Sequence, residues 1–180
     1  MLLLATAAQS AELNPQTSNF TWTASKITGS THTGQLAPIS SALTLKGDEI
    51  VRGEIILDLK NFTVTDLKGK IAQKFLGHIK SADFFNVEKF PTSRLEVHSV
   101  DKGVATGRLQ IMNKIKPVTF PIKKEGKVYS GTLTFDRTEF DIVYGSGKFF
   151  KGLGDKVISD EVSVKFSFSL KSNTTPSQTN

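Results

Sequence analysis

Apolar and polar residues alternate with a period of two through most of this sequence. Within residues 162–170 every second residue is apolar, and each residue between them is polar or charged. Successive side chains of a β-strand point to opposite faces, so this period gives a strand one apolar and one polar face. Residues 54–60 and 94–98 repeat the pattern. The chain is therefore predicted to consist mainly of strands that bury one face.

Short turn signals separate these runs, as at Lys46-Gly47-Asp48 and Glu125-Gly126-Lys127, and such turns are typical of hairpins. We expect eight strands, over residues 19–29, 32–45, 49–60, 92–100, 103–112, 117–124, 127–140 and 160–171. Pro117 and Pro121 favour an edge or bulged strand at the sixth position rather than a central one. An even number of hairpin-linked strands predicts an all-β fold, an antiparallel barrel or sandwich.

One segment departs from this period. Between Asp66 and Phe85 apolar residues recur every four positions, at Leu67, Ile71, Phe75 and Ile79. This spacing predicts a helix with Thr65 or Asp66 as its N-cap, followed by a short turn that starts at Ser81. A single helix within an antiparallel meander is typical of a lid over the mouth of a barrel.

The two ends of the chain differ from the middle. Leu2 to Leu4 resemble the end of the apolar part of a secretion signal, and Ala8-Gln9-Ser10 fits the small-x-small cleavage rule. Residues 1–18 are therefore expected to be a residual signal peptide or a disordered N-terminus, which predicts a periplasmic or secreted protein. Residues 172–180 contain no large apolar residue and are expected to form a disordered tail. A single domain is expected over residues 19–171.

The net charge of +6 is unevenly distributed, because five lysines and one acid lie between Lys60 and Lys80. Such a segment attracts anions, whether lipid head groups, a membrane surface or nucleic acid. The alternative is a solvated helix face that only improves solubility.

Signals for catalysis are weak. The chain has no cysteine, and its three histidines, His32, His78 and His98, are far apart and lack metal-ligand spacing. Asp136, Glu139 and Asp141 are close in sequence, but the adjacent Arg137 favours surface ion pairs over acid–base chemistry. We therefore expect no catalytic residue, no metal and no cofactor. A small hydrolase or isomerase that uses these carboxylates at a barrel mouth stays open as an alternative, as does a basic barrel that binds nucleic acid.

The chain contains 13 phenylalanines, which concentrate near the predicted helix and in the last hairpins. An eight-stranded barrel is wide enough to enclose one small ligand, and an apolar lumen favours an apolar one. The candidate ligand-binding residues combine apolar side chains of these regions with one lysine: Phe75, Leu76, Phe84, Phe85, Ile111, Phe135, Phe140, Tyr144 and Lys68. Lys68 is included because a lysine in the first helical turn could reach an anionic head group.

Several segments together resemble the YceI-like family of lipid-binding barrels. The most similar is KSADFFNVEKFPT at residues 80–92. Trp22 with residues 29–34, residues 106–111 with 116–118, residues 137–145 and residues 154–162 follow in the order of the family. Met112-Asn113 stands where the family often has His-Gly, so head-group contacts there are expected to differ.

The resemblance covers roughly residues 19–170. It implies an elongated, lipocalin-like, eight-stranded antiparallel barrel that holds a polyisoprenoid or a similar long-chain amphiphile and has no catalytic centre. The expected function is the non-catalytic binding, transport or storage of a long-chain isoprenoid or acyl lipid. Peripheral membrane contact and a homodimer are compatible with this interpretation, and no nucleic acid partner is expected.

Overall fold

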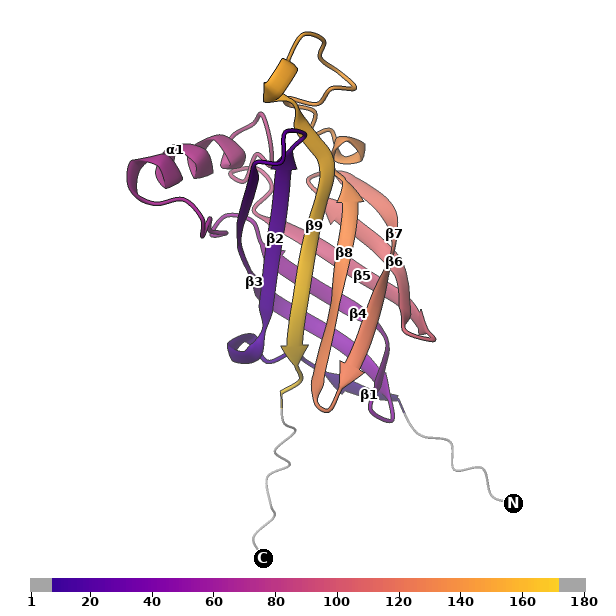
Figure 1. Cartoon of the computed structure of the whole chain (residues 1–180). Coiled ribbons are helices and arrows are strands. Elements are labelled where there is room, and N and C mark those ends of the chain that lie inside the picture. Colours follow the sequence, from indigo (N-terminus) through magenta and orange to yellow (C-terminus); the bar gives the residue numbers. More distant parts are fainter. Residues whose placement is uncertain (1–7, 172–180) are drawn as a thin grey trace, which may run out of the picture.

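The computed structural model describes residues 8–171, and its strands form one antiparallel sheet that closes into an elongated barrel (Figure 1). The barrel strands are β2 (Asn19–Lys26), β3 (Thr31–Lys46), β4 (Glu49–Asp58), β5 (Thr92–Asp101), β6 (Val104–Ile111), β7 (Lys114–Glu125), β8 (Val128–Asp136) and β9 (Ile158–Ser169). Each pairs with the next along the chain, and β9 returns to pair with β2. The prediction of an eight-stranded antiparallel barrel is confirmed.

The N-terminal segment adds a ninth strand that the sequence did not predict. Strand β1 (Ala8–Ala11) pairs antiparallel with residues Leu43–Lys46 of β3, and a 3₁₀ helix, η1 (Pro15–Thr17), follows it. Leu13 between them is buried. The expectation that residues 8–18 lack structure is therefore wrong, because this segment pairs with the barrel. Leu2 to Leu4 and the predicted tail at 172–180 lie outside the described residues.

The last strands differ from their predicted form. Strand β7 pairs with β6 over residues Lys114–Pro121 but with β8 only over Ile122–Glu125, so its first part has one unpaired side. The prediction of an edge-like strand around Pro117 and Pro121 therefore holds for that part, although β7 is central in strand order. Strand β8 ends at Asp136, four residues before the end of the predicted strand. A 3₁₀ helix, η2 (Arg137–Phe140), follows it and contacts β7.

Helix α1 (Gly69–Lys80) lies between β4 and β5 in sequence and flanks one end of the barrel, the upper end in Figure 1. The helix begins later than predicted. The carboxylate of Asp66 accepts hydrogen bonds from β3 instead of capping the helix, and Lys68 occupies the N-cap position without a side-chain cap bond. The chain then turns at Gly69, whose φ of +58° a glycine adopts without strain. The predicted N-cap was therefore wrong, and Lys68 precedes the first helical turn.

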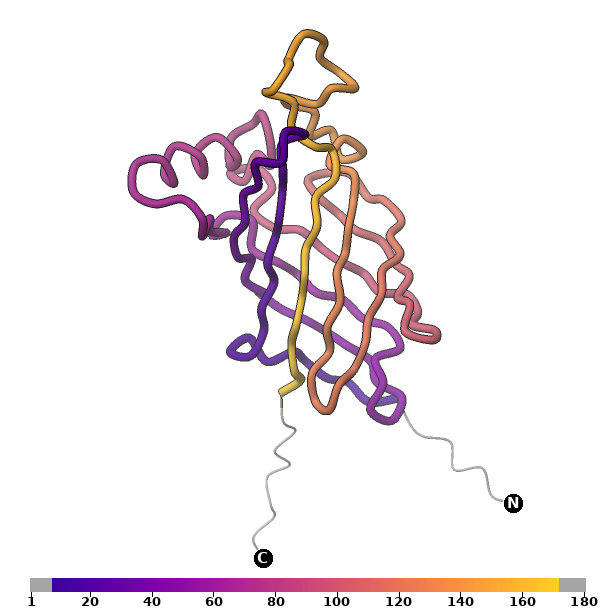
Figure 2. Tube along the Cα trace, in the orientation of Figure 1, coloured from indigo at the N-terminus to yellow at the C-terminus, as the bar shows by residue number. Residues whose placement is uncertain are grey.

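The opposite, lower end of the barrel is filled by aromatic side chains. The rings of Tyr129 and Phe168 stack with centroids 5.6 Å apart, and Phe20 stacks on Phe168 at 6.3 Å. All three side chains are buried. The Tyr129 hydroxyl also donates a hydrogen bond across this end to the carbonyl of Asp48 in the β3–β4 turn. The lower end is thus a packed core, and Figure 2 shows the turns β3–β4 and β7–β8 meeting there.

We predict that Phe168→Ala lowers the free energy of unfolding by about 3–5 kcal/mol, because the truncation leaves a cavity in the aromatic stack. Phe149→Ala is the matched control, since Phe149 is 57% exposed, and it should change the value by less than about 0.5 kcal/mol. Urea unfolding of the two variants measures the difference. Equal, small effects would show that the lower end is not a tightly packed core.

Candidate functional site

The upper part of the barrel encloses a cavity of about 460 Å³. It extends from the upper end of β2 and the start of β9 down to Phe20 and Phe166, which border the packed lower core. This volume lies in the range of sites that hold one small organic molecule. The barrel therefore has two different ends, one filled and one hollow.

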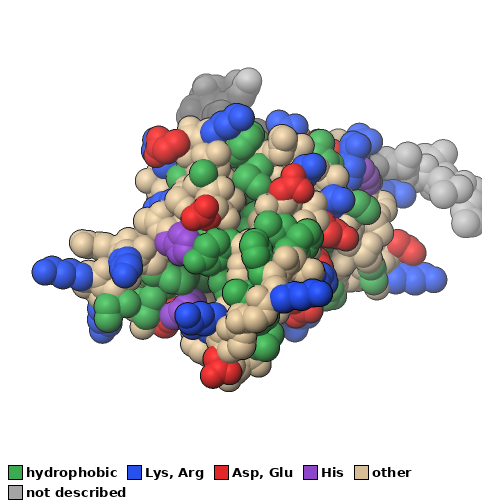
Figure 3. Space-filling view, turned by 90° about the horizontal axis from the view of Figure 1, so that it is seen from above, with side chains coloured by type: hydrophobic (Ala, Val, Ile, Leu, Met, Phe, Trp, Pro, Cys, Tyr) green, Lys and Arg blue, Asp and Glu red, His purple; other side chains and the backbone are tan. Residues whose placement is uncertain are grey.

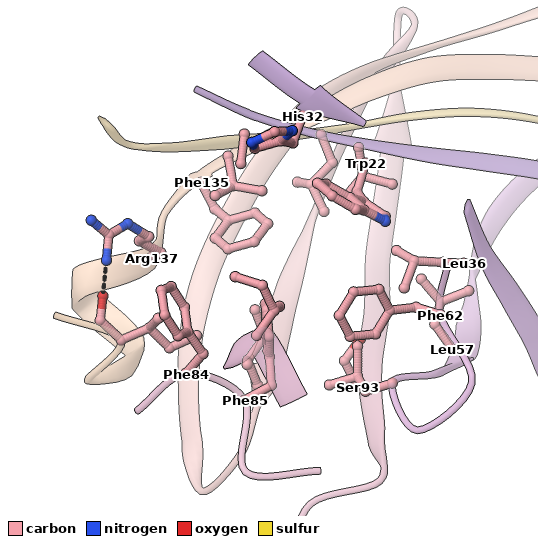
Figure 4. Close-up of a pocket in the computed structure, with 18 of the residues that line it drawn as sticks. Trp22, His32, Leu36, Leu57, Phe62, Phe84, Phe85, Ser93, Phe135 and Arg137 are labelled. Atoms are coloured by element: carbon pink, nitrogen blue, oxygen red, sulfur yellow. Dashed lines mark hydrogen bonds between the residues drawn. The ribbon is translucent and has the colours of Figure 1, made fainter. Parts of the chain in front are cut away.

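The lining is almost entirely apolar. Every barrel strand except β7 contributes residues to it, with further side chains from α1 and from the turn at Phe84 and Phe85. Figure 4 shows the rings of Phe62, Phe84, Phe85 and Phe135 pointing into the same space. Of the sequence-predicted site residues, six line the cavity: Phe75, Phe84, Phe85, Ile111, Phe135 and Tyr144.

Three predicted residues do not line the cavity. Phe140 is fully buried and packs edge-to-face on Phe135, with ring centroids 5.6 Å apart, so it supports the wall from behind. Leu76 is half-buried in α1 but is not part of the lining, although its neighbour Phe75 is. Lys68 is exposed because the helix starts after it.

The contribution of the first strands to the cavity was not predicted from the sequence. Trp22 and Leu36, from β2 and β3, line the cavity, as do Ile55 and Leu57 from β4. The alternation of apolar and polar residues could have identified them. These four residues occupy apolar positions of their strands, and the apolar face of each strand points into a closed barrel. The prediction followed the density of phenylalanine instead and therefore favoured the second half of the chain.

The position of Trp22 depends on a close backbone approach. Its indole N–H donates to the carbonyl of Thr63 at 2.9 Å, and its ring lies 6.3 Å from Phe75 in a stacked arrangement. A side chain at Gly34 would place Cβ 1.8 Å from that same carbonyl oxygen and 2.6 Å from the indole nitrogen. Gly34 thus allows the segment after β4 to lie against β3 and fix the indole at the cavity wall.

Two histidines that are far apart in sequence, His32 and His78, both line the cavity. The Nδ1 of His32 lies 2.7 Å from Asp66 Oδ2, and the Nε2 of His78 lies 3.5 Å from Asp83 Oδ2. Burial acts to raise the pKa of Asp66, but hydrogen bonds from the Thr33 N–H and the His32 ring outweigh it and hold the pKa below its ordinary value. Within residues 8–171 no cluster of three or more metal-ligating side chains occurs.

Arg137 holds the connection between β8 and β9 in place. Its side chain is only 4% exposed, and its guanidinium donates five hydrogen bonds, to the carbonyls of Ser159, Ile142, Tyr144 and Ile158 and to Asp160 Oδ1. Figure 4 draws one of these bonds. Burial lowers the pKa of Arg137, and Asp160 acts in the opposite direction. The expected surface pairing of this arginine with its neighbours was wrong, because it is a buried clamp on backbone carbonyls.

The nearby carboxylates are arranged for ion pairs. Asp136 lies 2.6 Å from Lys148 Nζ, and Asp141 lies 3.0 Å from Lys114 Nζ. Burial acts to raise the pKa of Asp136, but hydrogen bonds from Lys148 and Thr138 outweigh it and keep the pKa below its ordinary value. A general acid in a cavity needs a raised pKa. None of the residues that line the cavity is an aspartate or a glutamate, so nothing here favours the hydrolase or isomerase alternative.

Comparison with known proteins gives a consistent result. A family model described as the YceI-like domain matches residues 12–170. No curated protein sequence matches the chain significantly. Across residues 8–171, none of the helices has the length and apolar character required to cross a bilayer.

Solved structures share the fold at low identity. BcnA from Burkholderia cenocepacia aligns with a TM-score of 0.65 at 18% identity, over 89% of this chain and 99% of that one. A polyisoprenoid binding domain from Saccharophagus degradans, implicated in plant cell wall breakdown, aligns with a TM-score of 0.63 at 13% identity, over 89% and 97%. The YCEI protein of Campylobacter jejuni aligns with a TM-score of 0.54 at 12% identity, over 96% and 89%.

We predict that Arg137→Lys lowers the free energy of unfolding by about 3 kcal/mol, because lysine retains the charge but leaves buried carbonyls without donors. Arg108→Lys is the control, since Arg108 is 54% exposed and pairs with Glu96 at 3.2 Å, and it should cost less than about 1 kcal/mol. Thermal or urea unfolding measures both. If both variants are equally stable, the clamp has no structural role.

Proposed function

The chain belongs to the YceI-like family, and from that membership we propose that it is a non-catalytic carrier for one long-chain isoprenoid or acyl lipid. The observation that carries the proposal is the apolar cavity of about 460 Å³ above a packed aromatic floor. The lipid tail would lie along the barrel axis with its head group at the upper end. We further propose that the carrier acts in the periplasm or outside the cell.

The energetics of the cavity suit an alkyl or isoprenoid chain. Each CH₂ group transferred from water contributes about 0.8 kcal/mol, and the loss of translational and conformational freedom on binding opposes this gain. A long unbranched or isoprenoid tail therefore supplies enough transfer free energy, whereas a small polar metabolite would leave its hydrogen-bonding groups unpaired against this lining.

Two further points support binding over catalysis. One structural relative is described as a polyisoprenoid binding domain, and the family resemblance is to binding proteins. The carboxylates that an enzyme of this kind would use pair with lysines outside the cavity lining. Transport and storage both require a site that binds the lipid reversibly without changing it.

Trp22 provides the test, because it lines the cavity and is the only tryptophan of the chain. We predict that geranylgeraniol changes the emission of Trp22 and saturates at one molecule per chain. Ala24→Phe, which adds a ring to the cavity lining, should weaken binding by more than about tenfold, since the tail then loses several CH₂ contacts.

Ala42→Phe is the matched control, because Ala42 is exposed on β3 and does not line the cavity. It should bind geranylgeraniol like the unmodified protein. Failure of the unmodified protein to bind any isoprenoid or fatty acid, or identical binding by both variants, would contradict a site in the lumen.

A further inference from the structure

Two lysines mark the upper end of the cavity. Lys26 is the last residue of β2, and Lys156 lies at the end of the 3₁₀ helix η3 (Gly154–Lys156) just before β9, and both line the cavity. The strands hold them near each other, because Lys26 pairs with Ile158 and the N–H of Ile27 donates to the carbonyl of Val157 at 3.1 Å. We call these two side chains the rim lysines.

The rim lysines have no partner in the described part of the chain. Neither ammonium group makes an ion pair or a side-chain hydrogen bond within residues 8–171, whereas the nearby Lys148 pairs with both Asp136 and Asp160. The carboxylates closest to the histidines of this end, Asp66 and Asp83, are each paired with one of them. Asp155 is adjacent in sequence to Lys156 but exposed and not part of the lining.

The lining is therefore mostly apolar, and none of its residues is a carboxylate. Of its three lysine and arginine side chains, Arg137 is bonded to backbone carbonyls and to Asp160, so the rim lysines are the cations of the lining without a partner in residues 8–171. We infer that the rim lysines select an amphiphile with an anionic head group, a phosphate or carboxylate on the isoprenoid or acyl tail. This inference rests on the proposed lipid-carrier function. The ammonium groups would donate charge-assisted hydrogen bonds to the head group while their alkyl stems lie against the apolar wall.

This assignment replaces the expectation for Lys68. Lys68 lies at the N-cap of α1, and neither it nor Lys70 lines the cavity. All four lysines are exposed, so membership of the cavity lining, not exposure, distinguishes the rim lysines. The local excess of lysines in residues 60–80 thus points largely to solvent, whereas the cations at the opening come from the two ends of paired strands that are far apart in sequence.

The test compares geranylgeranyl phosphate with geranylgeraniol, using Trp22 emission at low and high salt. Lys26→Ala/Lys156→Ala should weaken binding of the phosphate by about tenfold at low salt, with a smaller effect at high salt, and leave binding of the alcohol within about twofold. Lys68→Ala/Lys70→Ala, which removes the same charge elsewhere, should leave both affinities unchanged. Inorganic phosphate should fail to displace the lipid, since it has no tail to bury.

The other outcomes distinguish failure of the head-group assignment from failure of lipid binding itself. Equal losses for both ligands, or none for either, would overturn the head-group assignment while leaving lipid binding in place. Displacement by inorganic phosphate would show a free-anion site instead. If the unmodified protein binds neither ligand, the proposed carrier function itself fails.

A second inference starts from exposed aromatic side chains. Phe149 and Phe150 are 57% and 46% exposed and lie between Lys148 and Lys151 in the β8–β9 connection. In Figure 1 this connection projects beyond the barrel at the end where α1 lies. Figure 3, which looks onto that end, shows hydrophobic side chains near the centre with charged side chains around them. The same connection contributes Tyr144 and Lys156 to the cavity lining.

We propose that this aromatic loop docks the open end of the barrel on an anionic bilayer. Phenylalanine rings enter the interfacial region of a membrane, and basic residues beside them are attracted to anionic lipids. Lys151, Lys26 and Lys156 supply that charge, and none of them forms an ion pair within residues 8–171. Docking there would let a lipid pass between bilayer and lumen without crossing water.

Sedimentation with phosphatidylcholine vesicles, with and without phosphatidylglycerol, tests this proposal. The unmodified protein should bind the anionic vesicles, and Phe149→Ser/Phe150→Ser should weaken that binding by more than about tenfold. The control is Val104→Ser/Val128→Ser, which changes two exposed residues in the hairpins of the opposite end and should bind normally. Unchanged binding of the phenylalanine variant, or binding of single-stranded oligonucleotides instead of vesicles, would overturn the proposal.

Discussion

The pairing of β9 with β2 is the interaction on which the rest of the structure depends. Seven residues of each strand face each other between Asn19 and Lys26, and this pairing converts a meander of hairpins into a closed barrel. Closure removes the free edges of the sheet and directs the apolar face of every strand toward one axis. Without it, the alternating residues of β9 would border an open sheet and no enclosed space would exist.

A closed barrel can be filled with side chains along its whole length. In this barrel the positions of the aromatic side chains determine which part of the interior contains the cavity. Tyr129, Phe168 and Phe20 stack across the lower end. At the upper end β7 and β8 separate, and the 3₁₀ helix η2, which carries Arg137 and Phe140, contacts β7 and β9 there. Phe140 packs behind Phe135 and does not line the cavity. The large aromatic side chains therefore fill the lower end of the lumen or pack behind its wall, and the upper part of the lumen stays free for a ligand tail.

Much of this architecture follows from local patterns. The strand period, the turns and the single helix predicted the barrel, and six of the nine proposed site residues line the cavity. The errors concern interactions between distant segments. Thr65 or Asp66 was expected to cap α1, but Asp66 accepts a hydrogen bond from the backbone of β3. Arg137 was expected at the surface, but it is buried and donates to carbonyls within residues 142–159. The rim lysines lie near each other only because β2 and β9 pair, and the spacing of these lysines in the sequence does not predict that pairing.

A lipid tail in the lumen is the property on which the proposed function depends. Native mass spectrometry of the protein purified from cells, together with analysis of an organic extract of the same sample, tests it most directly. One isoprenoid or acyl lipid should be bound per chain, released by the organic solvent and absent from an Ala24→Phe sample. A protein that carries no lipid, and that takes up none when isoprenoids and fatty acids are supplied, would contradict it.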